Sequence, residues 1–262
     1  MIKYYNLLWV FLGGTLLLIF TVPDYKVIKL TNGGKHIIEQ DIRNGEVSTF
    51  YPAGNVKTTI TYDKDVKNGP ATRYYSNGKI QLEMKFINGK REGVSKKYYI
   101  NGSLYATTPY SNNKINGERI TYYDDGSIKA KAQYFNNLHG TGLIEYTTTG
   151  NRIPERRINI ETDFYNGHDI LKFTIPDCYR EAFYTGKLVN GKYLDPSAKG
   201  VNPLPSTDGY HFVKIENIND GDEVICSCTT RGGNTYVTSR PINFIDQASI
   251  SSAEVISISS HK

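Results

Sequence analysis

Apolar and polar residues alternate along the middle of the chain, and this alternation predicts β-strands. Between residues 79 and 86, polar side chains alternate with Ile80, Leu82, Met84 and Phe86. A period of two places these four apolar side chains on one face of a strand, so we expect that face to be buried. Similar runs recur along the chain, and turn residues separate them. The pattern therefore predicts an all-β fold built from antiparallel hairpins.

Glycine recurs at a fixed spacing of 24 residues, so the chain is internally repetitive. One series comprises Gly54, Gly78, Gly102, Gly126 and Gly150, and a second comprises Gly45, Gly69, Gly93 and Gly117. The units that begin at Gly69, Gly93 and Gly117 share the pattern GxxxxYYxxGx[IL]xxxxx[FY]xN. The preceding unit, from Gly45, has Phe50-Tyr51 for the Tyr pair and Val56 for the aliphatic residue, and a degenerate copy starts at Gly140. Because stacked repeats bury a continuous core, we expect residues 45–150 to form one elongated antiparallel meander.

The first series of glycines is predicted to be structural. The pairs Asn77-Gly78, Asn101-Gly102 and Asp125-Gly126 are hairpin signals that should supply the positive φ angles of tight turns. Asp124 and Asp125 also invite interpretation as a catalytic carboxylate pair, but the neighbouring Gly126 favours turn residues. The turn assignment covers Gly54, Gly78, Gly102 and Gly126.

Adjacent aromatic residues recur in every unit and are the candidate binding residues. Neighbours on a strand face opposite ways, so each pair should place one ring on either side of the sheet. The candidates are Tyr74, Tyr75, Tyr98, Tyr99, Tyr122 and Tyr123, and a third aromatic position recurs at Tyr62, Phe86, Tyr110 and Tyr134. Two interpretations stay open. The rings either stabilise a thin sheet by cross-strand packing or form an uncovered surface that binds another protein.

On these residues the chain resembles the MORN-repeat family, in particular its bacterial variant, whose members are often catalogued as antitoxins of toxin–antitoxin pairs. The YYxxG turn and the N-G or N-N turn carry the resemblance over residues 45–150. The resemblance implies a noncatalytic β-sheet that binds proteins or, in other members, membrane lipids. By analogy, it also implies a toxin as the protein partner.

The N-terminal segment predicts membrane targeting. Residues 4–23 carry no charge, and the run from Leu7 to Val22 is densely apolar. We expect a hydrophobic helix within residues 1–23, either a transmembrane anchor or a signal peptide; a buried helix of the soluble fold is the third alternative. The predicted location is membrane-anchored or exported, in the periplasm or at the cell surface. Residues 24–44 would then be a linker or N-terminal cap.

A second domain is predicted after Gly150, where the 24-residue register ends. Short strand-like runs separated by Asn-Gly, Asp-Gly and Gly-Gly turns are typical of a β-sandwich, assigned to residues 151–246. The stretch Ile218–Val224 resembles the corner before the penultimate strand of immunoglobulin-like domains. The tail, residues 247–262, is either an edge strand or a disordered end.

The three cysteines of the predicted sandwich allow two interpretations, a disulfide or unpaired thiols. Cys226 and Cys228 lie two residues apart on a predicted strand, so their thiols share a face. Outside the cytoplasm, Cys178 could form a disulfide with Cys226 or with Cys228; buried unpaired thiols are the alternative. With three Cys and five scattered His, no metal site is expected.

Composition and charge exclude several function classes. A net charge of +5 is too mild and too mixed to indicate a nucleic-acid partner. Arg73, Lys96, Lys97 and Arg119 lie beside the aromatic pairs, where a solvated strand face is favoured and contact with anionic lipids is the alternative. No GxSxG, HExxH, P-loop or dinucleotide motif occurs. We therefore expect neither an enzyme, a cofactor nor a small-molecule substrate.

The sequence predicts a noncatalytic, protein-binding repeat protein that is exported or tethered to a membrane. The leading hypothesis is recognition of another protein by the repeat sheet, including neutralisation of a toxin in the manner of an antitoxin or immunity protein. The alternative is a cell-envelope scaffold, or a lipid- or surface-binding protein, in which the repeats act as a spacer.

Overall fold

The computed structural model describes residues 6–12, 15–21, 25–29 and 35–39 as strands, and residues 43–207, 209–219 and 221–242 together with their side chains. These residues are mostly β-structure, and the one helix among them is the 3-10 helix η1 (Ile215–Asn217). By its contacts the chain divides into two compact units. The first is Met1–Lys114 with Asp124–Gly126, and the second is Ile115–Tyr123 with Ser127–Lys262.

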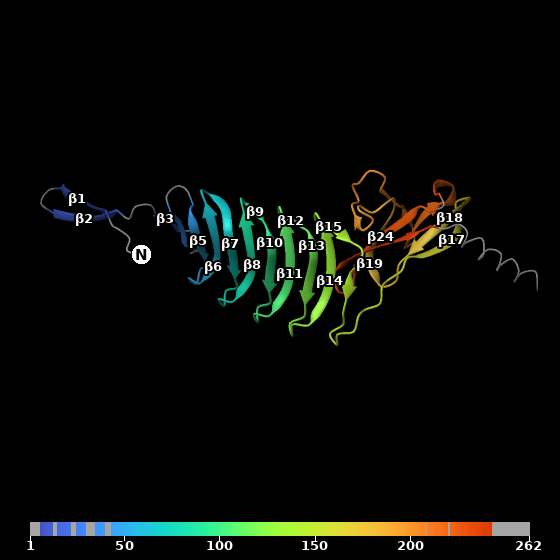
Figure 1. Cartoon of the computed structure of the whole chain (residues 1–262), viewed down its shortest axis with the longest axis horizontal. Helices are drawn as coiled ribbons and strands as arrows, with labels where there is room; N and C mark the ends of the chain where they lie inside the picture. The colour runs from blue at the N-terminus through green and yellow to red at the C-terminus, as the bar shows by residue number, and fades with distance from the viewer. Residues whose placement is uncertain are drawn as a thin grey trace, which may run out of the picture. The chain divides into compact units, whose positions relative to one another are not determined.

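The first unit is a meander of hairpins, as the 24-residue repeat predicts. Its neighbouring strands are, in order, β5 (Gly45–Phe50), β6 (Val56–Asp63), β7 (Val66–Tyr74), β8 (Ile80–Ile87), β10 (Gly93–Tyr98) and β11 (Leu104–Ser111). The short strand β9 (Lys90–Arg91) pairs with β8, and β12 (Lys114–Ile115) lies where the unit ends. Figure 1 shows β5 to β11 side by side along the sheet.

The YYxxG turns are closed by a left-handed glycine. In the second repeat the N–H of Gly78 donates to the carbonyl oxygen of Tyr75 at 3.0 Å, and the N–H of Tyr75 donates to Lys79 at 2.8 Å. Gly78 has a φ of 83°, and the strand register shifts between Arg73 and Tyr74. The conformation recurs at Gly54 (94°), Gly102 (98°) and Gly126 (88°). The positive φ expected of each pair therefore belongs to the glycine alone, as in hairpin loops with a glycine bulge.

The opposite ends of the hairpins, at the N-G and N-N turns of the repeat, close with two left-handed residues. The pairs with positive φ at both residues are Lys64-Asp65, Asn112-Asn113, Asn136-Asn137 and, with a glycine second, Asn88-Gly89. Two successive positive φ angles are the conformation of a type I′ turn, which Asn, Asp and Gly tolerate best.

The second residue of these turns also ties each hairpin to the start of its own repeat. The N–H of Asn113 donates to the carbonyl of Arg91 at 3.1 Å, and the Oδ1 of Asn113 accepts the N–H of Arg91 at 2.7 Å. Asp65 makes the same two bonds with Arg43 and adds an ion pair at 2.8 Å. The hydrogen bond from this guanidinium lowers the pKa of Asp65. We call this arrangement the turn latch.

The second unit contains the fourth repeat and continues into the C-terminal sheets. Its repeat hairpin is β13 (Gly117–Tyr122) with β14 (Ile128–Phe135). The sheet continues from β14 through β15 (Leu138–Gly140) to β20 (Tyr193–Leu194), and β16 (Ile144–Glu145) also pairs with β14. The predicted domain boundary at residue 150 therefore falls inside a single compact unit.

Two four-stranded antiparallel sheets form the predicted sandwich. One sheet has the order β17 (Asn159–Tyr165), β18 (His168–Thr174), β23 (Tyr210–Lys214) and β22 (Ser206–Thr207). The other has the order β21 (Asn202–Pro203), β19 (Cys178–Thr185), β24 (Glu223–Thr230) and β25 (Thr235–Pro241). Phe173, Phe183 and Val224 are fully buried in the core. Ala130 and Tyr134 of β14 belong to the same core, so the sandwich packs on the fourth repeat.

The N-terminal apolar segment forms a hairpin, and the prediction of a helix there is not met. β1 (Asn6–Leu12) pairs antiparallel with β2 (Thr15–Thr21), and β3 (Tyr25–Lys29) pairs with β4 (Lys35–Glu39). In the sequence, a Gly-Gly pair separates the two apolar runs, and such a pair is a hairpin signal. The prediction of a helix gave more weight to the length of the whole apolar stretch. Within the described residues, no helix has the length and apolar character to cross a membrane. The predicted tail, residues 247–262, lies outside the described residues.

Candidate protein-binding face

The register of the first unit fixes which side chains share a face. Ile60, Ala71 and Met84 lie directly opposite one another on β6, β7 and β8. Arg73 and Leu82 lie opposite each other one row further along β7 and β8. Because directly opposite residues of paired strands point to the same side, these five side chains share one face. We call it the groove face.

A shallow hollow of about 190 Å³ lies on the groove face. Ala71 is the small residue of its row, and its methyl group leaves space between the larger Ile60 and Met84. The hollow is lined by Thr58, Ile60, Lys67, Ala71, Thr72, Arg73, Leu82, Met84 and Phe86. The larger apolar residues of this set are half-buried. The buried face that the alternation predicts is therefore only partly covered in the first two repeats.

In the fourth repeat the same face is covered. The residues 48 positions after Leu82, Met84 and Phe86 are Ala130, Ala132 and Tyr134. All three are at most 9% exposed, and all belong to the core of the sandwich. The two alanines allow the sandwich to approach β14 closely, because a methyl group occupies little space above the sheet. The larger Leu82 and Met84 occupy these positions in the second repeat, where both are half-buried.

Cations lie over the third aromatic position in the first unit. Arg43 lies 4.4 Å from the ring centroid of Tyr62, Lys67 lies 5.1 Å from that of Phe86, and Arg91 lies 4.3 Å from that of Tyr110. These are cation–π distances. In the fourth repeat the cation is replaced by Ile115, which packs against the sandwich core that contains Tyr134. Charge is thus present where this part of the face is open and absent where the sandwich covers it.

The second tyrosine of three aromatic pairs ties one repeat to the next. Tyr51 donates its hydroxyl to the carbonyl of Tyr74 at 2.8 Å, Tyr75 to that of Tyr98 at 2.7 Å, and Tyr123 to that of Tyr146 at 2.8 Å. Tyr99 packs edge-on against the ring of Tyr105, with the centroids 5.0 Å apart. These contacts show a structural role for the predicted binding residues Tyr75, Tyr99 and Tyr123.

The first tyrosines are half-buried. Tyr98 donates its hydroxyl to the carboxylate of Glu83 at 2.5 Å, and burial together with this carboxylate raises the pKa of Tyr98 to about 12. Tyr74 and Tyr122 are also half-buried. None of the six predicted tyrosines lines the hollow. The signal that sequence reasoning missed is the change from Leu82 and Met84 to alanine at the equivalent positions of the fourth repeat.

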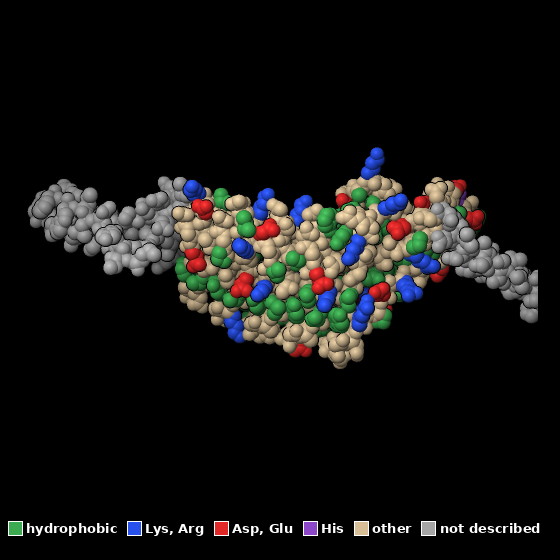
Figure 2. All heavy atoms as spheres, viewed as in Figure 1, with side chains coloured by type: hydrophobic (Ala, Val, Ile, Leu, Met, Phe, Trp, Pro, Cys, Tyr) green, Lys and Arg blue, Asp and Glu red, His purple; other side chains and the backbone are tan. Residues whose placement is uncertain are grey.

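The four basic residues beside the aromatic pairs do not form one site. Arg73 lines the hollow, Lys96 is exposed and lies opposite Glu83, Lys97 reaches the ring of Tyr105 at 4.9 Å, and Arg119 lies opposite Ala132. Among these four, only Arg73 belongs to the hollow. In the view of Figure 2, hydrophobic side chains gather over the repeat strands, with charged side chains of both signs scattered among them.

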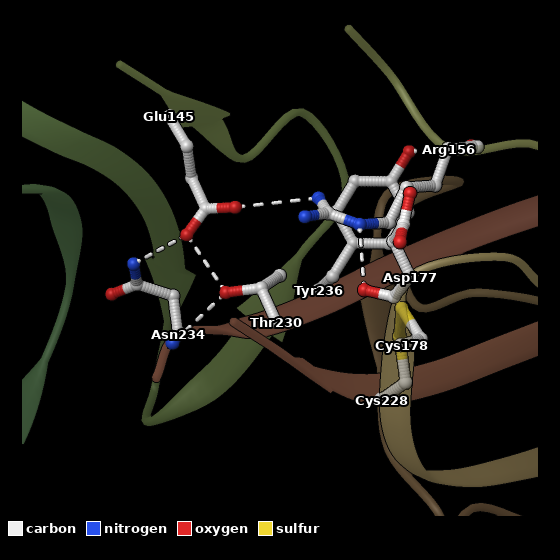
Figure 3. The surroundings of a disulfide bond; sticks show 8 residues. All are labelled: Glu145, Arg156, Asp177, Cys178, Cys228, Thr230, Asn234 and Tyr236. Carbon is white, nitrogen blue, oxygen red and sulfur yellow. Dashed lines mark hydrogen bonds and ion pairs between the residues drawn. A yellow bond between two sulfur atoms is a disulfide. The ribbon is translucent and has the colours of Figure 1, made fainter. Parts of the chain in front are cut away.

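A buried carboxylate in the second unit connects the fourth repeat with the sandwich. The side chain of Glu145, at the end of β16, is 5% exposed. Its oxygens accept hydrogen bonds from Thr230 at 2.7 Å, Asn234 at 2.8 Å and Arg156 at 3.3 Å (Figure 3). A Cβ atom at Gly232 would lie 2.5 Å from this carboxylate, so glycine is needed there. Since both oxygens have partners within the fold, Glu145 has a structural role that sequence reasoning missed.

The structure pairs Cys178 with Cys228, with the Cα atoms 5.7 Å apart, and leaves Cys226 as a buried thiol. Figure 3 shows this disulfide near Tyr236, whose hydroxyl donates to the carbonyl of Arg156 at 2.8 Å. Burial raises the pKa of Cys226 to about 12, so its thiol stays protonated and unreactive at neutral pH. In the part of the chain that the structure describes, no three His, Cys, Asp or Glu side chains gather to hold a metal ion.

A comparison with protein families matches the MORN repeat variant four times, at residues 43–64, 67–88, 91–112 and 115–136. Each match spans one hairpin, namely β5–β6, β7–β8, β10–β11 and β13–β14. A search of curated proteins finds no match. The comparisons support neither an antitoxin role nor the likeness of the sandwich to immunoglobulin-like domains, which stay predictions.

The family match agrees with the geometry of the array. MORN repeats are generally noncatalytic modules that bind proteins or membrane lipids. Here the hairpins stack in register, with a tyrosine tie at one end and a turn latch at the other. Residues 43–136 therefore form an array of four repeats that are similar to the MORN repeat variant.

Proposed function

We propose that this chain is a noncatalytic binding protein whose repeat array recognises another protein. The observation that carries the proposal is the groove face, which the sandwich buries in the fourth repeat and which is hollowed between half-buried apolar side chains in the first two repeats. There the face carries Leu82, Met84 and Phe86 around a hollow. Apolar hollows of this kind, with polar residues around them, are where interface anchor residues bind.

The tyrosine rows form the second part of the proposed interface. Tyr74, Tyr98 and Tyr122 are half-buried, so part of each ring stays accessible to a partner. Tyrosine is enriched at protein interfaces because it offers large contact area with a polar tip. Tyr98 binds Glu83, whose neighbours Leu82 and Met84 point to the groove face, so the tyrosine row of Tyr74, Tyr98 and Tyr122 would offer a second contact surface on the other face. The row of Tyr75, Tyr99 and Tyr123 mainly holds the sheet together.

The finer identity of the partner rests on the resemblance to variant MORN proteins catalogued as antitoxins. On that basis the partner would be a toxin, and the rigid sheet would occlude its active surface. The uncharged segment over residues 4–23 supports an exported or membrane-tethered location for this encounter. The alternative is a cell-envelope scaffold in which the sandwich, and not the repeats, makes the contact.

Affinity capture from the native host tests the proposal. The full-length chain is used as bait, retained proteins are identified by mass spectrometry, and the affinity of each purified partner is measured. Ala71→Leu fills the hollow, the triple change Tyr74→Ser, Tyr98→Ser and Tyr122→Ser removes the first tyrosine row, and Thr59→Leu is the control on the other face of β6. We expect weaker binding by the first two variants only. Full affinity in both would assign the contact to the sandwich and contradict the proposal.

A further inference from the structure

We propose that the hollow on the groove face binds an acidic polypeptide segment that inserts one large apolar side chain. This inference rests on the proposed function and names the chemistry of its partner.

The size of the hollow suits a side chain better than a whole ligand. Its volume of about 190 Å³ is below the roughly 300–1,000 Å³ of typical small-molecule pockets. Ile60, Leu82, Met84 and Phe86 surround it with apolar surface, and Ala71 forms its floor. Met84 can adjust to different shapes because methionine is unbranched and flexible. A single apolar anchor residue of a partner therefore fits the site.

The charges in the lining select an acidic partner. Lys67 and Arg73 belong to the lining, and it contains no Asp or Glu. The two cations lie opposite Tyr62 and Thr58, which are four residues apart on β6, or about 13 Å along the strand. Nearby carboxylates are engaged elsewhere, because Asp65 binds Arg43 and Glu83 binds Tyr98.

A segment with carboxylates on both sides of its apolar anchor would pair with both cations. For Arg73 the described residues offer no carboxylate within ion-pair distance. Its guanidinium is exposed and can bind a carboxylate through two parallel hydrogen bonds. Lys67 lies over the ring of Phe86, which holds its charge at the edge of the hollow.

A polypeptide is a better occupant than a lipid. An acyl chain needs a long continuous apolar channel, whereas the row next to the floor combines Leu82 with Arg73 and Thr58. The fourth repeat supplies an internal precedent, since there the equivalent positions are buried by polypeptide, namely the sandwich. The first unit would thus be covered by a partner in the way that the fourth repeat is covered within the chain.

A peptide selection tests the inference. Phage that display random 12-residue peptides are selected on the immobilised full-length chain, and enriched peptides are synthesised for affinity measurements. We expect an apolar residue flanked by Asp or Glu, with binding that weakens as salt is added. Ala71→Leu should weaken binding about tenfold or more, as expected for loss of an anchor contact, and Lys67→Glu with Arg73→Glu should do the same. Thr59→Leu and Lys85→Glu, on the other face of the sheet, are the matched controls.

The outcomes separate the inference from the proposed function. Peptides that respond to Ala71→Leu but lack acidic residues and ignore the charge reversal would overturn the acidic partner and leave the groove as a binding site. If Ala71→Leu weakens the binding of no enriched peptide while a captured host protein still binds, the assignment of the binding site to the hollow is wrong. Binding only to phosphatidylglycerol vesicles, lost in Ala71→Leu, would replace the polypeptide with a lipid. If Ala71→Leu does not fold, Leu82→Thr, which introduces the residue of the first repeat, takes its place.

Discussion

Individual side chains decide how firmly each hairpin is latched at its type I′ turn. Asn113 exchanges two hydrogen bonds with Arg91, whereas Gly89 keeps only the main-chain bond to Lys67 at 2.8 Å. The third repeat therefore has both the main-chain and the side-chain hydrogen bond of the turn latch, whereas the second repeat has only the main-chain bond. The second repeat shows that the turn conformation survives the loss, because Gly89 has a φ of 79° and Asn113 one of 70°.

Replacing Asn113 with glycine should lower the free energy of unfolding by about 1 kcal/mol, because the side-chain acceptor for the N–H of Arg91 is lost. Glycine adopts the φ of 70° without strain, so Asn113→Ala should be less stable still. Urea unfolding followed by circular dichroism measures both. A glycine variant as stable as the natural chain would show that this bond contributes nothing.

Asp65 should make the latch of the first repeat sensitive to acid. Its pKa is lowered in the folded chain by the hydrogen bond from Arg43. A lowered folded pKa contributes stability that is present above the unfolded pKa, about 3.9, and is lost as the pH falls through the folded value. Asp65→Asn, which introduces the residue of the third and fourth repeats, should therefore lose less stability below about pH 4. Identical pH profiles of unfolding for the two chains would contradict this role.

The thiol of Cys226 should be inert while the chain is folded. Its pKa is raised to about 12 by burial, so almost no thiolate exists at pH 8. Iodoacetamide should label Cys226 only after unfolding in urea, and mass spectrometry of the peptide that contains it shows this directly. Rapid labelling of the native chain would mean that β24 opens readily.

At the scale of elements, the hairpins could be predicted from the sequence. Which face of each hairpin another part of the chain buries could not. The 24-residue period and the alternation from Ile80 to Phe86 are local signals, so strands and turns follow from them. Which face is buried depends on what packs upon it, and that is decided by the sandwich, far along the sequence. The N-terminal helix was predicted wrongly because length outweighed a Gly-Gly turn signal. The structural role of Glu145 could not be predicted because its partners, Thr230 and Asn234, lie more than 80 residues away in the sequence.

The contact between β16 and the β24–β25 turn should depend on Glu145. Glu145→Ala leaves the guanidinium of Arg156, whose side chain is 11% exposed, without its carboxylate. Removing one member of a buried ion pair typically costs about 3–5 kcal/mol, so the second unit should be strongly destabilised. Thermal unfolding measures the loss. Glu155→Ala is the matched control, because Glu155 pairs with Arg152 on the surface and should change stability little. Equal effects of the two substitutions would contradict the structural role of Glu145.

At the scale of the whole molecule, the two units treat the same repeat face differently. The fourth repeat has Ala130 and Ala132 beneath its own sandwich, whereas the second repeat has Leu82 and Met84 around an open hollow. One chain thus shows both the covered and the uncovered form of the face. This contrast leads to the central claim that a partner protein covers the groove face of the first unit.

The most direct measurement uses the methyl group of Met84, since the chain has only two methionines and Met84 lines the hollow. The full-length chain labelled with ¹³C at the methionine methyl groups gives two signals, which Met84→Leu assigns. Titration with a selected peptide or a captured partner should shift or broaden the Met84 signal in step with binding and leave Met1 unchanged. Saturation by a tight-binding partner with an unmoved Met84 signal would contradict the account.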